Sequence, residues 1–270
     1  MININPISIF DSGIGGISVL KYMRVLLPNE KIIYFSDSDF APYGNKSEKL
    51  ITKRTLNIAE FLVSMNTKIM IIACNTATAA AISQLRKLYP ELLLVGVEPG
   101  LKPAAEITQS GNIGVLATDT TLKSQKFLKL KAQISDLFNV NFFIQPCHGL
   151  ANQIEKGELN TLKTKKMLQN LILPLINENV DTIVLGCTHY PFLKNLIMEI
   201  IKPEIKIIDT SMSIAKQAYS LLNKNKLNLN DFCLSEKILG YTTGKNKVLY
   251  DAFNMLLNLK IPVSKVKIYD

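Results

Sequence analysis

Residues 68–97, KIMIIACNTATAAAISQLRKLYPELLLVGV, contain a predicted strand, helix and second strand in direct succession. The run KIMIIAC is continuously apolar, as strands buried on both faces of a parallel sheet are. Residues 75–89 have the pattern of a helix, and residues 92–97 return to a strand pattern. This succession predicts a parallel sheet with helices packed on its faces.

The same alternation extends toward the N-terminus. PISIF, residues 6–10, predicts a strand, DSGIGG a glycine turn, and residues 17–27 a helix. KIIYFSD, residues 31–37, predicts the next strand, and residues 47–65 predict an amphipathic helix after a loop that contains APYG. These segments together predict one doubly wound α/β lobe.

A second series of strands and helices follows Glu98-Pro99-Gly100. We predict helices near residues 101–109, 122–132, 161–178 and 211–222, strands at residues 112–118, 140–146, 181–187 and 205–209, and short strands in the tail. We therefore expect an α/β protein of two similar doubly wound lobes, with parallel sheets facing each other across a central cleft. Because the tail can return to the first lobe, that lobe is expected to comprise residues 1–97 with 211–270, and the second lobe residues 98–210.

The composition is that of a globular protein. Of the 270 residues, 47% are hydrophobic and 20% charged. The apolar runs are far shorter than the roughly 20 residues that span a bilayer, and no basic and apolar leader precedes Ile7, so we expect a cytoplasmic protein without membrane association. The net charge is +9, but the lysines are scattered and no basic run is interleaved with aromatic residues. This pattern predicts a solvated surface and no nucleic-acid partner.

The four cysteines are Cys74, Cys147, Cys187 and Cys233. They are widely spaced and form no CxxC pair, so neither a disulfide scaffold nor a metal site is predicted. Two of them stand in similar sequence: KIMIIACNTATA surrounds Cys74 and DTIVLGCTHYPF surrounds Cys187. Ligands bind beyond the carboxyl ends of parallel strands, so we expect one thiol on each wall of a shared cleft.

A pair of thiols is suited to inverting an α-carbon. One group must remove the proton, and another, already protonated, must deliver one to the opposite face. The ordinary pKa of cysteine is about 8.5, and a helix N-terminus lowers it, so a thiolate and a thiol can coexist near neutral pH. We expect both cysteines to lie where helices begin. The alternative is that each is a small core residue, but the polar residues that follow both cysteines favour a site.

Six segments together resemble the glutamate racemases of the aspartate/glutamate racemase superfamily. In chain order they are FDSGIGG, APYG, ACNTATA, GVEPG, ATDTTLKS and GCTHYP, between about Ile9 and Asp209. The resemblance implies interconversion of L- and D-glutamate by two-cysteine proton transfer, without pyridoxal phosphate, metal or any other cofactor. It implies that D-glutamate supplies peptidoglycan synthesis, and with it cell wall biogenesis and cell shape. Family members associate in different ways, and a homodimer is one of the assemblies that this allows.

The resemblance also implies which residues are catalytic. Besides Cys74 and Cys187, Asp11 handles protons beside the first thiol and His189 assists the second. Glu155 matches an acidic position of the family, although CHGLANQIEKGE around it departs from the usual VPL-containing form. Judged from the residues alone, Asp11 could instead cap the following helix, and His189 could be structural.

A larger set of residues is implied to bind the substrate. These are Asp11, Ser12, Pro42, Tyr43, Gly44, Asn75, Thr76, Thr118, Thr121, Thr188 and His189. Amides, hydroxyls and helix N-termini are suitable donors to carboxylates, while a type II turn at APYG and helix capping by the two threonines of TDTT are the competing interpretations. Cys147 and His148 are left out, because adjacent residues on a strand point to opposite faces. DSGIGG has neither the GxGxxG spacing nor the GK[ST] of nucleotide-binding loops.

Three other functions remain open at this point. The same machinery could act on aspartate. A cysteine hydrolase could use Cys74 as nucleophile and His189 as base, which leaves Cys187 unexplained. A two-lobed binding protein would bind a ligand tightly without reaction.

Overall fold

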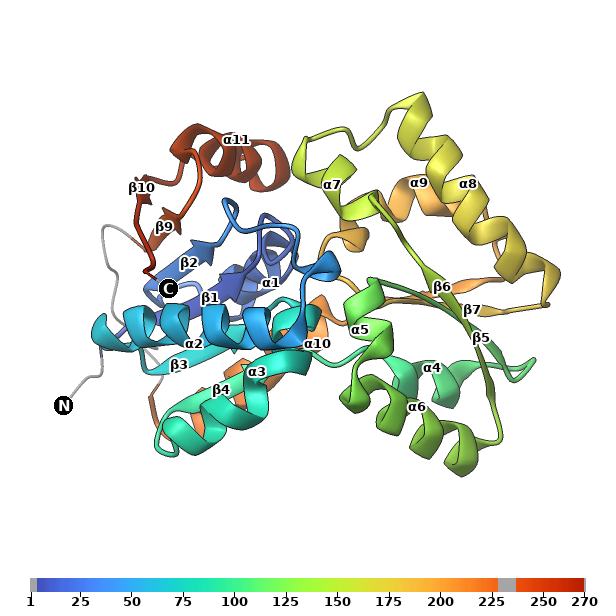
Figure 1. Ribbon diagram of the computed structural model, residues 1–270, viewed down its shortest axis with the longest axis horizontal. Coiled ribbons are helices and arrows are strands. Elements are labelled where there is room, and N and C mark those ends of the chain that lie inside the picture. The colour runs from blue at the N-terminus through green and yellow to red at the C-terminus, as the bar shows by residue number, and fades with distance from the viewer. Residues whose placement is uncertain (1–3, 228–236, 270) are drawn as a thin grey trace. The chain divides into compact units, whose positions relative to one another are not determined.

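The computed structural model describes residues 4–227 and 237–269, so Cys233 lies outside the described residues. The chain divides into two compact units, Met1–Val97 with Ser211–Asp270 (unit 1) and Glu98–Thr210 (unit 2). Each unit contains one sheet, all of whose strands are parallel, with helices packed against it (Figure 1). The predicted α/β fold with two parallel-sheet lobes is confirmed. In the described part of the chain, no helix combines the length and apolar character needed to cross a membrane.

The sheet of unit 1 has the strand order β10-β9-β2-β1-β3-β4. Its strands are β1 (Ile7–Asp11), β2 (Ile32–Ser36), β3 (Ile69–Ile72), β4 (Leu93–Gly96), β9 (Ile238–Thr242) and β10 (Val263–Lys265). Strand β1 lies between β2 and β3, and Asp11 pairs in register with Ser36. Because the strands are parallel, the residues that follow β1, β2 and β3 meet at one edge of the sheet.

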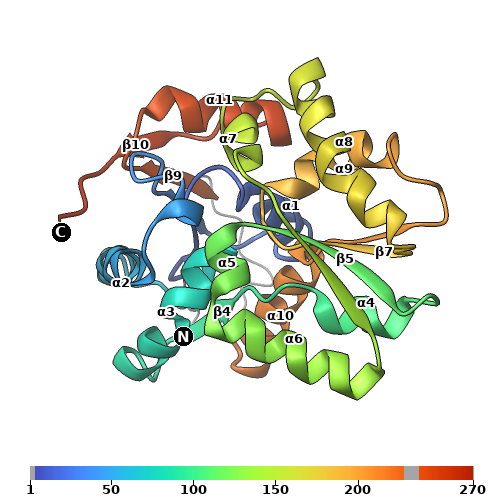
Figure 2. The same cartoon turned by 45° about the vertical axis from the view of Figure 1, so that its right-hand side comes forward.

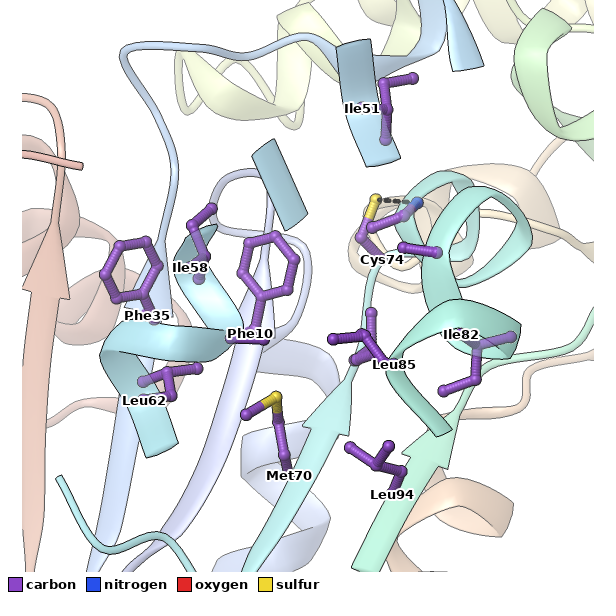
Figure 3. Packing of buried hydrophobic residues seen from close by; sticks show 14 of the residues in the cluster. Phe10, Phe35, Ile51, Ile58, Leu62, Met70, Cys74, Ile82, Leu85 and Leu94 are labelled. Carbon is purple, nitrogen blue, oxygen red and sulfur yellow. Dashed lines mark hydrogen bonds between the residues drawn. The ribbon is translucent and has the colours of Figure 1, made fainter. Parts of the chain in front are cut away.

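Helices cover both faces of this sheet. They are α1 (Ile17–Leu26), the 3-10 helix η1 (Tyr43–Asn45), α2 (Glu48–Ser64), α3 (Asn75–Leu88), α10 (Ser211–Lys224) and α11 (Asn246–Leu257). Helices α2 and α3 pack side by side on one face, and α1 packs with α10 and α11 on the other. Figure 3 shows Phe10 and Phe35 from the sheet packed with Ile58 and Leu62 of α2, in the same core as Cys74. Both faces of β1 are buried, as its apolar run predicts.

The C-terminal segment was predicted to contain short strands, and the structure adds a helix between them. Helix α11 follows β9 and buries Leu249, Ala252 and Phe253 on one side. This spacing of three and four residues is that of one helix face. The ring of Phe253 lies edge-on to Tyr34 of β2, with centroids 5.4 Å apart, so the helix is held by the core of the sheet.

Unit 2 has a four-stranded sheet in the order β6-β5-β7-β8. Its elements are α4 (Leu101–Ile107), β5 (Asn112–Ala117), α5 (Asp119–Lys123), α6 (Gln125–Phe138), β6 (Asn141–Pro146), α7 (Leu150–Glu155), α8 (Leu162–Asn177), β7 (Thr182–Leu185), η2 (Tyr190–Leu193), α9 (Lys194–Met198) and β8 (Lys206–Ile208). Figure 2 shows α4 and α6 on one side of this sheet and α8 and α9 on the other. The helix predicted over residues 122–132 is two helices, because Ser124 ends α5 and its Oγ caps α6 by accepting from Phe127 N–H at 3.2 Å. Helix α7 was not predicted.

Candidate active site

The glycine turn after β1 places Asp11 and Ser12 at the carboxyl edge of the sheet. Asp11 is fully buried, and its Oδ1 accepts the N–H of Gly13 at 2.9 Å. A Cβ at Gly16 would lie 2.9 Å from the Cβ of Asp11 and 3.1 Å from that of Ala73, so only glycine lets α1 begin this close to the strands. The N-cap of α1 is Gly16, without a side-chain bond. Asp11 therefore does not cap the helix, and its carboxylate holds the turn.

Cys74 joins β3 to α3 and caps the helix. Its Sγ accepts the N–H of Ala77 at 3.5 Å, and its thiol donates to Ser12 Oγ at 3.6 Å. The side chain is buried, with 6% of the residue exposed. The positive end of the helix dipole faces this sulfur, which favours negative charge on it. The prediction that a helix begins at this cysteine is confirmed.

Asn75 and Thr76 begin α3 and are both buried. The Nδ2 of Asn75 has no hydrogen-bond partner among the described residues. Leaving a buried donor unpaired costs about 1–3 kcal/mol, so an unpaired amide at a helix N-terminus indicates a place for an acceptor that the folded chain does not supply.

The APYG loop forms the 3-10 helix η1 in place of a type II turn. Pro42 is extended before it, and Tyr43 is buried with its ring against Phe10. Gly44 follows within the same turn. Burial and the negative charge of Asp37 raise the pKa of Tyr43 well above its ordinary value, and the hydroxyl donates to Asp37 Oδ2 at 2.7 Å.

In unit 2, Cys187 follows β7 after one glycine. A Cβ at Gly186 would lie 2.9 Å from the Cβ of Ala117 and 3.0 Å from the carbonyl oxygen of Leu116, so the chain passes too close to β5 for any side chain. Cys187 is buried, with 8% exposed. The two cysteines therefore share the arrangement of an apolar strand, one small residue and a buried thiol.

A helix was predicted to begin at Cys187, and the structure has a 3-10 helix, η2, that begins three residues later. The carbonyl of Cys187 accepts the N–H of Tyr190 at 3.1 Å, which closes a four-residue turn, and η2 begins at Tyr190. An α-helical bond to this carbonyl would need the N–H of residue 191, which is Pro191 and has none.

His189 connects Cys187 to Glu155 at the end of α7. Its Nδ1 lies 3.6 Å from Cys187 Sγ, and its Nε2 lies 2.5 Å from Glu155 Oε1. Burial lowers the pKa of His189, but the hydrogen bonds with Cys187 and Glu155 outweigh it and raise the pKa well above its ordinary value. The imidazole therefore carries a positive charge beside Cys187. The structure brings these three predicted residues together although the sequence around Glu155 departs from the family pattern.

Three threonines lie near the carboxyl ends of the same sheet. Thr118 follows β5 and caps α5, where its Oγ1 accepts the N–H of Thr121 at 3.4 Å and lies 3.0 Å from the Thr121 hydroxyl. The capping interpretation therefore describes their local role. Thr188 is buried beside Cys187.

Cys147 and His148 lie in the turn after β6 and not on a strand, so the reason given for separating them does not hold. The side chains of Cys147 and His148 nevertheless have different surroundings. The Cys147 thiol is buried, donates to the carbonyl of Gln145 at 3.4 Å, and has its pKa raised to about 12 by burial. The His148 side chain is 76% exposed and pairs with Asp119 at 2.8 Å. The Cys147 thiol also interacts with the hydroxyl of Tyr190, the residue after His189.

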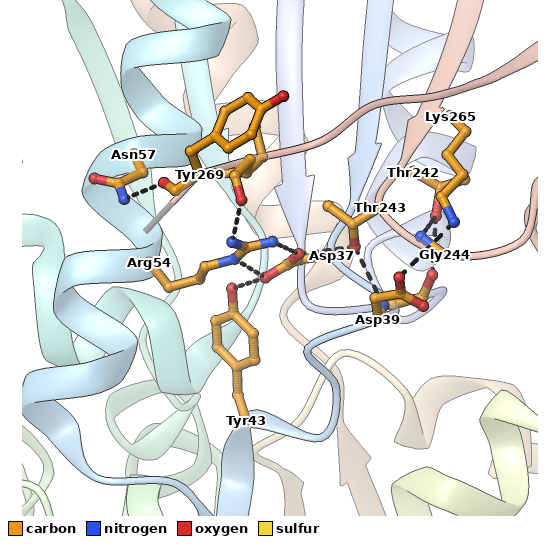
Figure 4. A network of polar contacts seen from close by, with 12 residues as sticks. Asp37, Asp39, Tyr43, Arg54, Asn57, Thr242, Thr243, Gly244, Lys265 and Tyr269 are labelled. Atoms are coloured by element: carbon orange, nitrogen blue, oxygen red, sulfur yellow. Dashed lines mark hydrogen bonds and ion pairs between the residues drawn. The ribbon is translucent and has the colours of Figure 1, made fainter.

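Unit 1 also contains a buried ion pair that was not predicted from the sequence. Asp37 follows β2 and is fully buried, and Arg54 of α2 donates to both of its oxygens at 2.9 Å (Figure 4). The sequence does contain one signal for Asp37: the strand segments PISIFD and KIIYFSD both end in an aspartate, Asp11 and Asp37. Within residues 4–227 and 237–269, no three His, Cys, Asp or Glu side chains gather in a metal-binding group.

Comparison with known proteins gives the family. Residues 18–218 match the family model described as Asp/Glu/hydantoin racemase. A glutamate racemase of Ectopseudomonas mendocina is 47% identical over 222 residues, which are 82% of this chain and 84% of the relative. Among solved structures, a glutamate racemase isoform of Bacillus anthracis matches with a TM-score of 0.88 and 28% identity, over 98% of both chains. The glutamate racemase of Francisella tularensis in complex with D-glutamate matches with a TM-score of 0.86 and 30% identity, over 98% of both chains. This chain therefore belongs to the Asp/Glu/hydantoin racemase family and is an amino-acid racemase.

Proposed function

We propose that the protein interconverts L- and D-glutamate, with Cys74 and Cys187 acting on opposite faces of the α-carbon of one glutamate. The proposal rests on one observation, which is that the two buried cysteines have similar surroundings. Each follows a parallel strand after one small residue, and each has polar groups at its sulfur: Ser12 and the α3 N-terminus at Cys74, and His189 with Glu155 at Cys187. The choice of glutamate is supported by the relatives, which are glutamate racemases.

In the proposed reaction one sulfur is a thiolate and the other a thiol. The thiolate takes the α-proton, the Cα–H bond breaks, and its electron pair passes to the planar carbanion. The second thiol then gives its proton to the opposite face and becomes the thiolate. In the reverse direction the two roles exchange. Cationic His189 stabilises the thiolate of Cys187, and Asp11 assists proton transfer at Cys74.

The substrate is held by donors at the strand ends. We assign the unpaired Nδ2 of Asn75 to a substrate carboxylate, because the α3 N-terminus adds positive potential there. The other contacts of the proposal come from both units. They are Ser12, Asp11, Pro42, Tyr43, Gly44 and Thr76 in unit 1, and Thr118, Thr121, Thr188 and His189 in unit 2.

The proposed reaction requires no cofactor, because both proton transfers use side chains of the protein. We further propose that it takes place in the cytoplasm and supplies D-glutamate for peptidoglycan, and through it for cell wall biogenesis and cell shape. A homodimer is the assembly proposed, and sedimentation of the purified protein tests it.

The reaction is tested by incubating L-glutamate with purified protein in deuterated water without added cofactor. We expect D-glutamate that carries deuterium at the α-carbon. Cys74→Ala and Cys187→Ala should each abolish racemisation, whereas Cys147→Ala, which removes a buried thiol to which the proposal gives no proton-transfer role, should keep it. Full activity of Cys187→Ala would refute the two-cysteine mechanism. Faster turnover of L-aspartate than of L-glutamate would refute the choice of substrate.

A further inference from the structure

We propose that Asp37 is a positioning residue for the substrate loop, residues 37–46, and that Arg54 connects this loop to residues 266–269 near the C-terminus. The inference rests on the proposed function, because it takes the Tyr43-Gly44 segment as a substrate contact. The loop itself, the ion pair and the tail all belong to unit 1.

Asp37 receives hydrogen bonds from three side chains that come from distant parts of the sequence. Tyr43 donates to Oδ2 at 2.7 Å, and Thr243, which follows β9, donates to Oδ1 at 2.9 Å. Arg54 donates through Nε to Oδ2 and through Nη2 to Oδ1, both at 2.9 Å. Figure 4 shows these groups converging on one carboxylate. A buried carboxylate is costly unless its oxygens are paired, so the three donors must be held in place for the loop to keep this conformation.

The hydroxyl proton of Tyr43 is thus donated to Asp37. The bond from Tyr43 to Asp37 fixes the position of the tyrosine ring and of the backbone at Tyr43 and Gly44. The ring lies edge-on to Phe10, which precedes Asp11, with centroids 6.3 Å apart. Tyr43 also belongs to the apolar cluster that contains Cys74. The network therefore sets where the loop stands relative to the first cysteine.

The loop is held on its other side by the turn after β9. Ser38 Oγ lies 2.9 Å from Thr242 Oγ1, and the N–H of Asp39 donates to Thr243 Oγ1 at 3.2 Å. A Cβ at Gly244 would lie 2.3 Å from Ser38 Oγ, so the two turns are in close contact. The same threonine that binds Asp37 therefore also binds the backbone of the loop.

Arg54 extends the network to the tail. Its Nη1 donates to the carbonyl of Ile268 at 2.8 Å, and Asn57, one helical turn further along α2, donates to the carbonyl of Tyr269 at 2.8 Å. Val266 N–H donates to Thr242 O at 2.9 Å. The guanidinium also lies over the ring of Phe40, 5.2 Å from its centroid. One arginine thus binds the loop carboxylate, a loop ring and the tail.

The test uses conservative variants of two donors that bind different oxygens of Asp37. Tyr43→Phe and Thr243→Val remove one hydroxyl each and preserve shape. Each lost bond to a charged group should raise KM for glutamate about tenfold, with kcat within about threefold of wild type. The double variant should raise KM by less than the product of the two single effects, because both act through one carboxylate.

Two matched controls remove a hydroxyl elsewhere in unit 1. Tyr89→Phe changes a tyrosine at the far end of α3, about 20 Å along the helix from Cys74, and Thr52→Val changes a hydroxyl that donates to Ala80 O. Both should keep wild-type KM. Deletion of residues 268–270 should raise KM as the two loop variants do, because Arg54 loses its tail partner.

The outcomes separate the two proposals. Variants with lowered melting temperature but wild-type KM and kcat would show that the network is only structural and would overturn the inference, as would a fall in kcat at unchanged KM. Unchanged KM after the deletion would overturn the role of the tail. If the wild-type protein does not racemise glutamate, the proposed function fails, and calorimetric binding of L-glutamate to the same variants then tests the loop.

Discussion

Replacing Gly186 by alanine should damage both the stability of unit 2 and the placement of Cys187. The added Cβ would lie 2.9 Å from the Cβ of Ala117 and 3.0 Å from the carbonyl oxygen of Leu116. Neither neighbour is the end of a flexible side chain, so β7 and β5 must move apart by several tenths of an ångström. Overpacking of this kind costs about 1–3 kcal/mol. Because the next residue is Cys187, the shift reaches its sulfur directly, and we expect kcat to fall roughly tenfold to a hundredfold.

The second variant in this experiment is Ala117→Gly. Alone it should destabilise β5 by about 0.5–1 kcal/mol, since glycine is unfavourable inside a strand. Combined with Gly186→Ala it removes the contact between the two Cβ atoms but not the contact with Leu116 O. The double variant should therefore recover part of the stability and part of kcat lost in Gly186→Ala. Urea unfolding gives the free energies, and the change of optical rotation of L-glutamate gives kcat. Additive free energies would refute the reasoning, as would a Gly186→Ala protein with wild-type stability.

Three further predictions concern single charges and donors. Glu155→Gln should lower the pKa of His189 by removing the adjacent negative charge, so the basic limb of the kcat–pH profile should move to lower pH; an unmoved limb would contradict the role of this pair. Asn75→Ala should raise KM for glutamate roughly tenfold without lowering the melting temperature, since the amide it removes has no partner in the described part of the chain. Partial burial raises the pKa of Asp181, but hydrogen bonds from Thr108 and the backbone of Ser110 and its neighbour lower it to about 2 from 3.8. The folded-state pKa is depressed, so this stabilisation is complete above about pH 4 and is lost as pH falls toward 2; Asp181→Asn should lose less stability than wild type over that interval, as measured by urea unfolding.

The elements that the sequence predicted best are those whose signal is local. The continuously apolar runs of β3 and β7 mark buried parallel strands, and Cys74 lies at a helix N-terminus as expected. Helix α7 is too short, at six residues, for a helical period to show. The difference at Cys187 came from treating both cysteine segments as equivalent, although Pro191 removes the N–H that an α-helix needs there.

Contacts between distant residues could not be predicted from spacing. Glu155 and His189 are 34 residues apart, and Asp37 and Thr243 are 206 residues apart. Such pairs depend on where whole strands and helices pack, which a local pattern does not encode. The resemblance to a family supplied Glu155, but nothing in the sequence marked Asp37 or Thr243 as partners.

The difference between the two cysteine segments has an electrostatic consequence. Cys74 faces the N-terminus of a 14-residue α-helix, so backbone N–H groups and the helix dipole favour its negative charge. No α-helix begins at Cys187, because Pro191 lacks the N–H that its first bond would need, and the 3-10 helix η2 follows instead. The turn from Cys187 to Tyr190 brings His189 to the sulfur, and Glu155 keeps the imidazole charged although it is buried. Backbone dipoles respond little to pH, whereas a histidine titrates. Loss of the imidazolium charge as pH rises should therefore slow racemisation in both directions, because L- and D-glutamate are equally stable and kcat/KM must stay equal in the two directions.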